Sequence, residues 1–194
     1  LVAAMKYLAS NGVTSVHAVD AATYADGIAR VRASGGQITR IYYMQTISRW
    51  KDLKDQIERE GKGDRWVSTG GVKGFVDGSL GSHTAAFLEP YTDLPADTGL
   101  FVNTEEDLYR WISDADKAGL QVVIHAIGDR AINTLLNIYE RVASENGERD
   151  RRFRIEHSQH IAFADIPRYG KLEVIASMQP YHAIDDGRWA EGYI

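Results

Sequence analysis

Two histidines in this sequence each follow a short apolar segment of the kind that forms a buried strand. His125 comes directly after a β-branched run at 122–124, and His157 ends the segment 153–157. In a sheet wound with helices, side chains at the carboxyl ends of the strands face the ligand. The two histidines are separated by about one βα unit, roughly 30 residues. The spacing therefore predicts two imidazoles on neighbouring strands at one rim of a sheet.

A neutral imidazole binds Zn²⁺ and similar divalent cations through a ring nitrogen. A single histidine in such a position is more often a hydrogen-bonded core or rim residue than a ligand. Two histidines on successive strand ends favour a metal site. We therefore take His125 and His157 as candidate metal ligands and candidate catalytic residues.

Lys73 lies in an earlier strand-like segment, 71–77. An ammonium group only donates hydrogen bonds and cannot bind a metal. A desolvated lysine amine is reactive, and carbon dioxide converts it to a carbamate, whose oxygens can bridge two cations. Spacing alone favours the simpler interpretation, a lysine whose stem lies along the strand and whose ammonium reaches water.

Other chemistry-bearing residues are weaker candidates. His182 follows the last strand-like segment and could contact substrate at the same rim. His83 and His160 fall in expected loops and are predicted to be solvated. Neighbouring side chains of a strand point to opposite faces of the sheet, so Glu156 should point away from His157. We therefore expect Glu156 to be a structural partner of an arginine or a helix rather than a catalytic acid.

The segment 77–81 is rich in glycine but lacks the P-loop pattern. Its glycines are expected to allow tight turns or a close approach of backbone to ligand. This segment begins a loop at 77–103, and loops of that length are often functional.

The elements that must position these residues alternate between strands and helices. Expected strands fall at 13–19, 38–44, 66–76, 120–125, 153–157 and 173–179, and expected helices at 5–10, 21–33, 50–60, 104–118, 129–146 and 165–169. Such alternation predicts an α/β fold with a parallel sheet. A doubly wound sheet and a (β/α)₈ TIM barrel both fit, but a barrel typically needs about 250 residues. A barrel here is therefore expected to be partial.

The composition of the chain disfavours some binding partners and removes some kinds of metal site. The chain has 194 residues, no cysteine and a net charge of −5. The acidic balance disfavours binding to nucleic acid or an acidic membrane surface. The absence of cysteine removes thiolate metal sites and disulfides and leaves the compartment open. No apolar stretch reaches the roughly 20 residues of a membrane helix.

Taken together, the motifs resemble the metal-dependent amidohydrolase superfamily. They are Val72-Lys73 with Asp77-Gly-Ser-Leu-Gly-Ser82, then His125-Ala-Ile-Gly-Asp-Arg-Ala131, Arg154-Ile-Glu-His157 and Ser177-Met-Gln-Pro180. They look most like the YtcJ-like branch, which includes N-substituted formamide deformylases. The match covers most of the chain, in order. Its individual motifs are short, and their joint occurrence is what makes it specific.

The resemblance implies a (β/α)₈ barrel with a metal centre of one or two divalent ions, zinc being the first choice. In that family a His-x-His pair, a usually carbamylated lysine, two histidines and an aspartate ligate the metal. Lys73, His125 and His157 match the middle three contributions. The His-x-His pattern does not occur in this sequence. The chain is accordingly expected to be a catalytic-barrel segment over 1–194, about strands two to seven, with N- and C-terminal parts missing.

By this resemblance the protein hydrolyses non-peptide carbon–nitrogen bonds in small amide or formamide-like substrates. The isolated chain is expected to be inactive, and its uncovered strands favour a homo-oligomer. The alternative is a non-catalytic binding or regulatory module derived from such a barrel. A doubly wound nucleotide-binding sheet ranks last, because no Gly-x-Gly-x-x-Gly loop follows the first strand.

Overall fold

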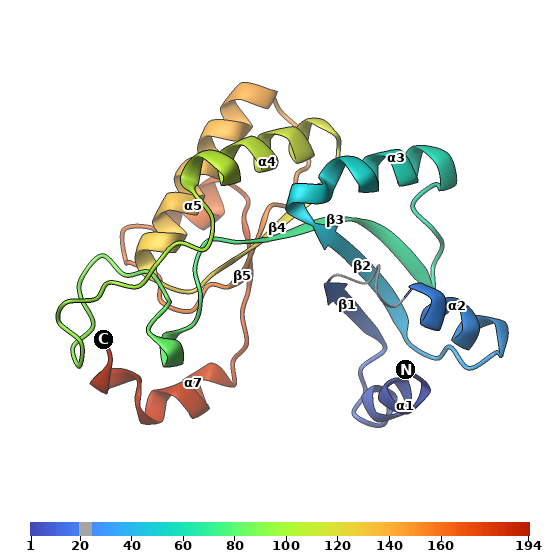
Figure 1. Ribbon diagram of the computed structural model, residues 1–194, viewed down its shortest axis with the longest axis horizontal. Helices are drawn as coiled ribbons and strands as arrows, with labels where there is room; N and C mark the ends of the chain where they lie inside the picture. Colours follow the sequence, from blue (N-terminus) through green and yellow to red (C-terminus); the bar gives the residue numbers. More distant parts are fainter. Residues whose placement is uncertain (20–24) are drawn as a thin grey trace. The chain divides into compact units, whose positions relative to one another are not determined.

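A computed structural model describes residues 1–19 and 25–194 (Figure 1). Six parallel strands follow the same order in the sheet as in the sequence, β1 to β6. The chain divides into two compact units, residues 1–73 and 74–194, and strand β3 runs across the boundary. Among the described residues, no helix is long and apolar enough to cross a membrane.

The first unit contains three strands and three helices. Its elements are α1 (Val2–Ser10), β1 (Ser15–Val19), α2 (Ala25–Ala33), β2 (Arg40–Thr46), α3 (Trp50–Glu60) and most of β3 (Val67–Phe75). Strand β2 pairs in parallel with β1 and with β3. Met5 of α1, Ile28 of α2 and Ile41 of β2 form a small buried cluster, so one apolar face of each helix covers the sheet.

The second unit begins with the end of β3 and contains the remaining three strands. Its elements are α4 (Glu105–Lys117), β4 (Gln121–Ala126), α5 (Asp129–Asn146), β5 (Arg154–His157), α6 (Ile166–Lys171), β6 (Ile175–Ser177) and α7 (His182–Asp185). Strand β5 pairs in parallel with β4 on one side and β6 on the other. Helices α4 and α5 lie side by side next to β4 and β5 (Figure 1).

Helix α5 supplies much of the core of this unit. Its buried side chains are Ala131, Ile132, Leu135, Leu136, Ile138, Tyr139 and Val142, which recur at the three- and four-residue spacing of one helical face. The three apolar residues of β4, Val122, Val123 and Ile124, are fully buried. A strand covered on both faces reads as a continuous apolar run, and this run is what made β4 recognisable.

The long loop 77–103 is folded onto the second unit and has its own apolar cluster. Leu80, Ala85, Phe87 and Tyr91 pack with Ile127, the second residue beyond His125. The loop contains one 3₁₀ turn, Leu80–Ser82, and no strand. It ends at Thr104, whose hydroxyl accepts the Asp107 backbone N–H and caps α4.

The expected elements are confirmed, with shifted bounds. The start of the expected helix 21–33 lies outside the described residues, and α2 is seen from Ala25. His17 lies in the middle of β1. The last strand is shorter than 173–179, because Glu173 has a left-handed φ of 53° that is incompatible with an extended strand.

Candidate metal centre

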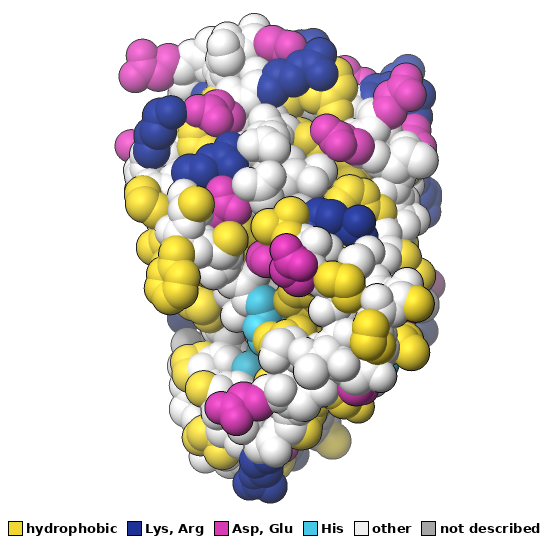
Figure 2. All heavy atoms as spheres, turned by 90° about the vertical axis from the view of Figure 1, so that its left-hand side faces the viewer, with side chains coloured by type: hydrophobic (Ala, Val, Ile, Leu, Met, Phe, Trp, Pro, Cys, Tyr) yellow, Lys and Arg dark blue, Asp and Glu magenta, His cyan; other side chains and the backbone are white. Residues whose placement is uncertain are grey.

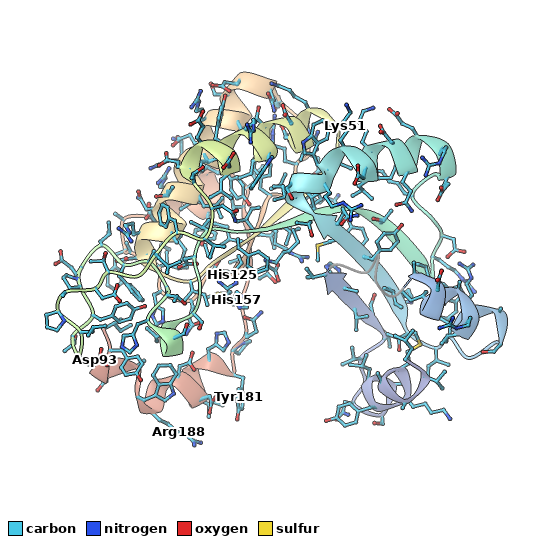
Figure 3. All side chains as sticks on the ribbon, viewed as in Figure 1. Lys51, Asp93, His125, His157, Tyr181 and Arg188 are labelled. Carbon is cyan, nitrogen blue, oxygen red and sulfur yellow. The ribbon has the colours of Figure 1, made fainter. Side chains whose placement is uncertain are left out.

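His125 and His157 lie next to one another at the ends of adjacent strands (Figure 3). Their ring centroids are 4.6 Å apart and the rings meet edge to face, with an interplanar angle of 70°. In the register of β4 and β5, Ala126 is the direct partner of His157, and His125 precedes Ala126 by one residue. The sequence prediction that these two imidazoles share one rim is confirmed.

The side chain of His125 is held by the loop that follows β3. Its Nε2 lies 2.7 Å from the carbonyl oxygen of Gly78 and 3.5 Å from Asp77 Oδ1. A carbonyl oxygen only accepts hydrogen bonds, so Nε2 carries the proton. In the neutral ring the lone pair is therefore on Nδ1.

Asp77 is a buried carboxylate that ties this loop to the end of β4. Its Oδ2 accepts the backbone N–H groups of Ala86 and Gly128, both at 2.9 Å, and its Oδ1 accepts that of Ile127 at 3.0 Å. The side chain is fully buried. Burial raises the pKa of Asp77 to about 6, although the three N–H donors oppose the shift.

Two glycines allow this close packing. A Cβ on Gly128 would lie 2.1 Å from the Ala86 carbonyl oxygen, and one on Gly78 would lie 2.0 Å from Thr84 Oγ1. At Gly78 and Gly128, the absence of a side chain therefore allows neighbouring segments of this chain to approach closely.

The backbone at His157 is unusual for a residue with a side chain. His157 has φ of 72° and Ser158 has φ of 46°, both in the left-handed region. Non-glycine residues in that region cost of order 1–3 kcal/mol, and such residues cluster at functional sites. The turn directs the chain out of β5 immediately after the imidazole.

Gln179, just beyond β6, contacts the ring of His157. Its Oε1 lies 2.7 Å from His157 Nδ1, and its Nε2 donates to the Ser177 carbonyl oxygen at 3.3 Å. The Ser177 contact orients the amide, because turning it over would place two oxygens against each other. His157 Nδ1 therefore donates to Gln179, and the lone pair of the neutral ring is on Nε2.

His182, the expected substrate contact, lies beside the same group. Its ring stacks on His157 with centroids 6.0 Å apart and an interplanar angle of 20°. Both rings line a cavity of about 440 Å³ together with His160, Met178 and Pro180. On the face drawn in Figure 2, histidine side chains come to the surface between hydrophobic and acidic ones.

Lys73 belongs to β3 within the first unit, opposite Thr46 in the parallel ladder with β2. It is only 5% exposed, so the expectation of a lysine reaching water is wrong. Within the part of the chain that the structure describes, no three His, Cys, Asp or Glu side chains are grouped closely enough to hold a metal ion. The ligand roles of Lys73, His125 and His157 remain predictions.

The expected solvation of the loop histidines is also wrong. His83 pairs with Asp93 at 3.0 Å and packs between Tyr91 and Tyr193. His160 packs against Phe87, and burial lowers the pKa of its imidazole. Both loops fold back onto aromatic side chains, which the position of these histidines in loops did not indicate.

Glu156 behaves as predicted, since it forms an ion pair of 2.5 Å with Arg154 two positions earlier on the same face of β5. Asp77 and Gln179 were not singled out as site residues. Both stand inside the quoted motifs, and the signal that would have found them is their place directly after a strand that ends at the same rim.

Comparison with known proteins gives the family. The model of the Amidohydrolase family matches residues 1–194. Protein LONG AFTER FAR-RED 3 of Arabidopsis thaliana is 42% identical over 94% of this chain and 33% of its own length. A Bacillus subtilis (strain 168) protein named "Putative amidohydrolase YtcJ" is 31% identical over 97% of this chain and 36% of its own.

Solved structures agree with the sequence comparisons. An uncharacterized metal-dependent hydrolase from Pyrococcus furiosus superposes on all of this chain and 40% of its own, with a TM-score of 0.82 and 30% identity. A similar protein from Pyrococcus horikoshii OT3 gives a TM-score of 0.81 over 38% of its chain, again at 30% identity.

The parallel strands and alternating helices thus form a partial α/β barrel like that of the metal-dependent hydrolase structures on which the chain superposes. The chain belongs to the amidohydrolase family, and it is YtcJ-like. It spans about a third of the length of the curated relatives it matches.

Proposed function

We propose that this chain carries part of the active site of a metal-dependent hydrolase that cleaves non-peptide carbon–nitrogen bonds in amides or formamides. The observation that supports it most is the edge-to-face pair of His125 and His157, whose centroids are 4.6 Å apart at adjacent strand ends. Family membership and the titles of the structural neighbours, which name metal-dependent hydrolases, support the same class.

The residues fit a divalent cation such as zinc. Each imidazole donates its N–H to a fixed oxygen, His125 to Gly78 and His157 to Gln179. This arrangement sets the lone-pair nitrogens as Nδ1 in His125 and Nε2 in His157, and a second-layer oxygen acceptor is typical of ligating histidines. A bound cation of this kind acidifies water and polarises a carbonyl group.

Lys73 is the proposed third ligand, as a carbamate. Its burial supports this role, because a desolvated amine is the form that reacts with carbon dioxide. His182 is proposed to contact the substrate, since its ring lines the same cavity as His157. Met178 and Pro180 give that cavity an apolar wall against which a substrate substituent packs.

The test is metal binding by the purified protein, followed by hydrolysis. Titration with Zn²⁺ or Mn²⁺ should show binding that the double variant His125→Gln/His157→Gln loses, whereas His17→Gln in β1 retains it. Equal binding by the double variant would overturn the ligand assignment. Because the isolated chain is expected to be inactive, hydrolysis is tested in a full-length barrel that contains this segment, by release of formate or acetate from N-formyl and N-acetyl amides. A metal-loaded full-length barrel that is inactive on both would overturn the substrate class.

A further inference from the structure

Gln179 follows β6, and its side chain faces His157. We propose that Gln179 is a positioning residue that fixes the tautomer of His157 and so prepares Nε2 to bind a metal. The proposal rests on the proposed function only for its last step. The hydrogen bond and the tautomer stand without any metal.

The chain of contacts is short and directed. The Ser177 carbonyl accepts from Gln179 Nε2 at 3.3 Å, which leaves Oε1 as the atom that faces His157 Nδ1 at 2.7 Å. Because an amide oxygen accepts only, the proton of the neutral imidazole is on Nδ1. A histidine side chain in water favours the Nε2–H form, so the protein must stabilise the other tautomer through this contact.

The backbone around His157 explains why its ring is bonded by a side chain, that of Gln179. His157 and Ser158 both adopt left-handed φ, so the chain turns sharply away just after the imidazole. His157 is also the last residue of β5, one position beyond Glu156, which pairs with Ser177 in the β5–β6 ladder. Gln179 supplies an acceptor at the place where that ladder has ended.

The cavity beside α7 is bounded in part by apolar side chains. The burial of the Asp77 carboxylate is accounted for by its hydrogen bonds to backbone N–H groups such as that of Ile127. Gln179 is half-buried, its side-chain nitrogen donates to the Ser177 carbonyl, and its side-chain oxygen accepts from an imidazole nitrogen.

The experiment reads the tautomer directly in protein labelled with ¹⁵N-histidine and freed of metal by a chelator. Long-range ¹H–¹⁵N spectra are recorded at about pH 8, above the ordinary imidazole pKa of about 6.5. Wild type should show His157 as Nδ1–H. Gln179→Leu, which lacks the acceptor, should move the ring largely to Nε2–H, and Gln179→Glu, which keeps an oxygen, should restore Nδ1–H.

Gln159→Leu is the matched control, because Gln159 lines the same cavity but donates to Asp186 instead of contacting His157. It should leave the tautomer of His157 unchanged. An Nε2–H signal for His157 in the wild type, or an unchanged Nδ1–H signal in Gln179→Leu, would overturn the positioning role. Circular dichroism shows whether each variant is folded.

A second arm separates this inference from the proposed function. Titration with Zn²⁺ alone should show affinity about 10- to 100-fold weaker in Gln179→Leu than in wild type, the usual cost of losing such a partner. A tautomer change in a protein that binds no Zn²⁺ would support the positioning role and overturn the metal site. Equal Zn²⁺ affinity in the two proteins would overturn the last step of the inference.

Discussion

The Asp77 carboxylate accepts the backbone N–H of Gly128 at 2.9 Å, although 51 positions separate the two residues in the sequence. The bond joins the loop after β3 to the turn between β4 and α5, just past His125. Together with the bonds to Ala86 and Ile127, it places the Gly78 carbonyl against the His125 ring. The stability of this loop and the orientation of His125 are therefore linked.

Asp77→Ala should destabilise the protein by about 3 kcal/mol or more, because three buried backbone N–H groups would lose their acceptors at about 1–3 kcal/mol each. Urea unfolding in chelator measures the effect. Asp93→Ala serves as the control, since its half-exposed pair with His83 is expected to contribute about 1 kcal/mol or less. Similar losses in both variants would contradict the anchoring role of Asp77.

Gly128→Ala should destabilise the protein by about 1–3 kcal/mol, because its new Cβ would overlap the Ala86 backbone and push the loop away. The matched variant is Gly170→Ala in α6, where a Cβ meets nothing within 4 Å. That change should be neutral or stabilising by up to about 1 kcal/mol through helix propensity. Thermal and urea unfolding of both variants checks the contrast, which would fail if Gly128→Ala were as stable as wild type.

Tyr139→Phe should cost about 0.5–1.5 kcal/mol. The Tyr139 ring is fully buried and its hydroxyl donates to the Arg154 carbonyl at 3.1 Å, joining α5 to β5. Removing the hydroxyl leaves that bond unmade without changing the packing of the ring. Tyr7→Phe, at a ring that is 72% exposed, should leave the unfolding free energy unchanged. A silent Tyr139→Phe would show that the bond contributes nothing net.

His160 should titrate below its ordinary pKa of 6.5, because burial disfavours the charged ring more than Asp186 and Asp129 favour it, and His182 adds to the lowering. The unfolded chain then binds more protons than the folded chain as the pH falls through 6.5. On account of this residue, the unfolding free energy should therefore fall as the pH drops below about 6.5.

NMR titration of the imidazole C–H resonances checks this directly, with His160→Gln identifying the signal. The variant should also lose part of the acid destabilisation seen in urea unfolding between about pH 7 and pH 5. A His160 midpoint at or above 6.5 would contradict the assigned effect of burial.

The sequence by itself determined the order of strands and helices and the positions of the two histidines. The β-branched run at 122–124 and the apolar face of α5 are local patterns whose periods differ, so they specify a strand and a helix without further information. A parallel sheet then places consecutive strand ends at one rim, which is why the pairing of His125 with His157 could be predicted.

Only the tertiary structure decided which groups surround those histidines. Asp77 and Gln179 reach His125 and His157 across long stretches of chain, and no periodic pattern records which loop oxygen meets which ring nitrogen. Likewise, His83 and His160 were expected to be solvated because they fall in loops, whereas their neighbours in space are aromatic. Hydrogen-bond partners and burial depend on how separate segments pack, and packing is a property of the folded chain rather than of any one segment.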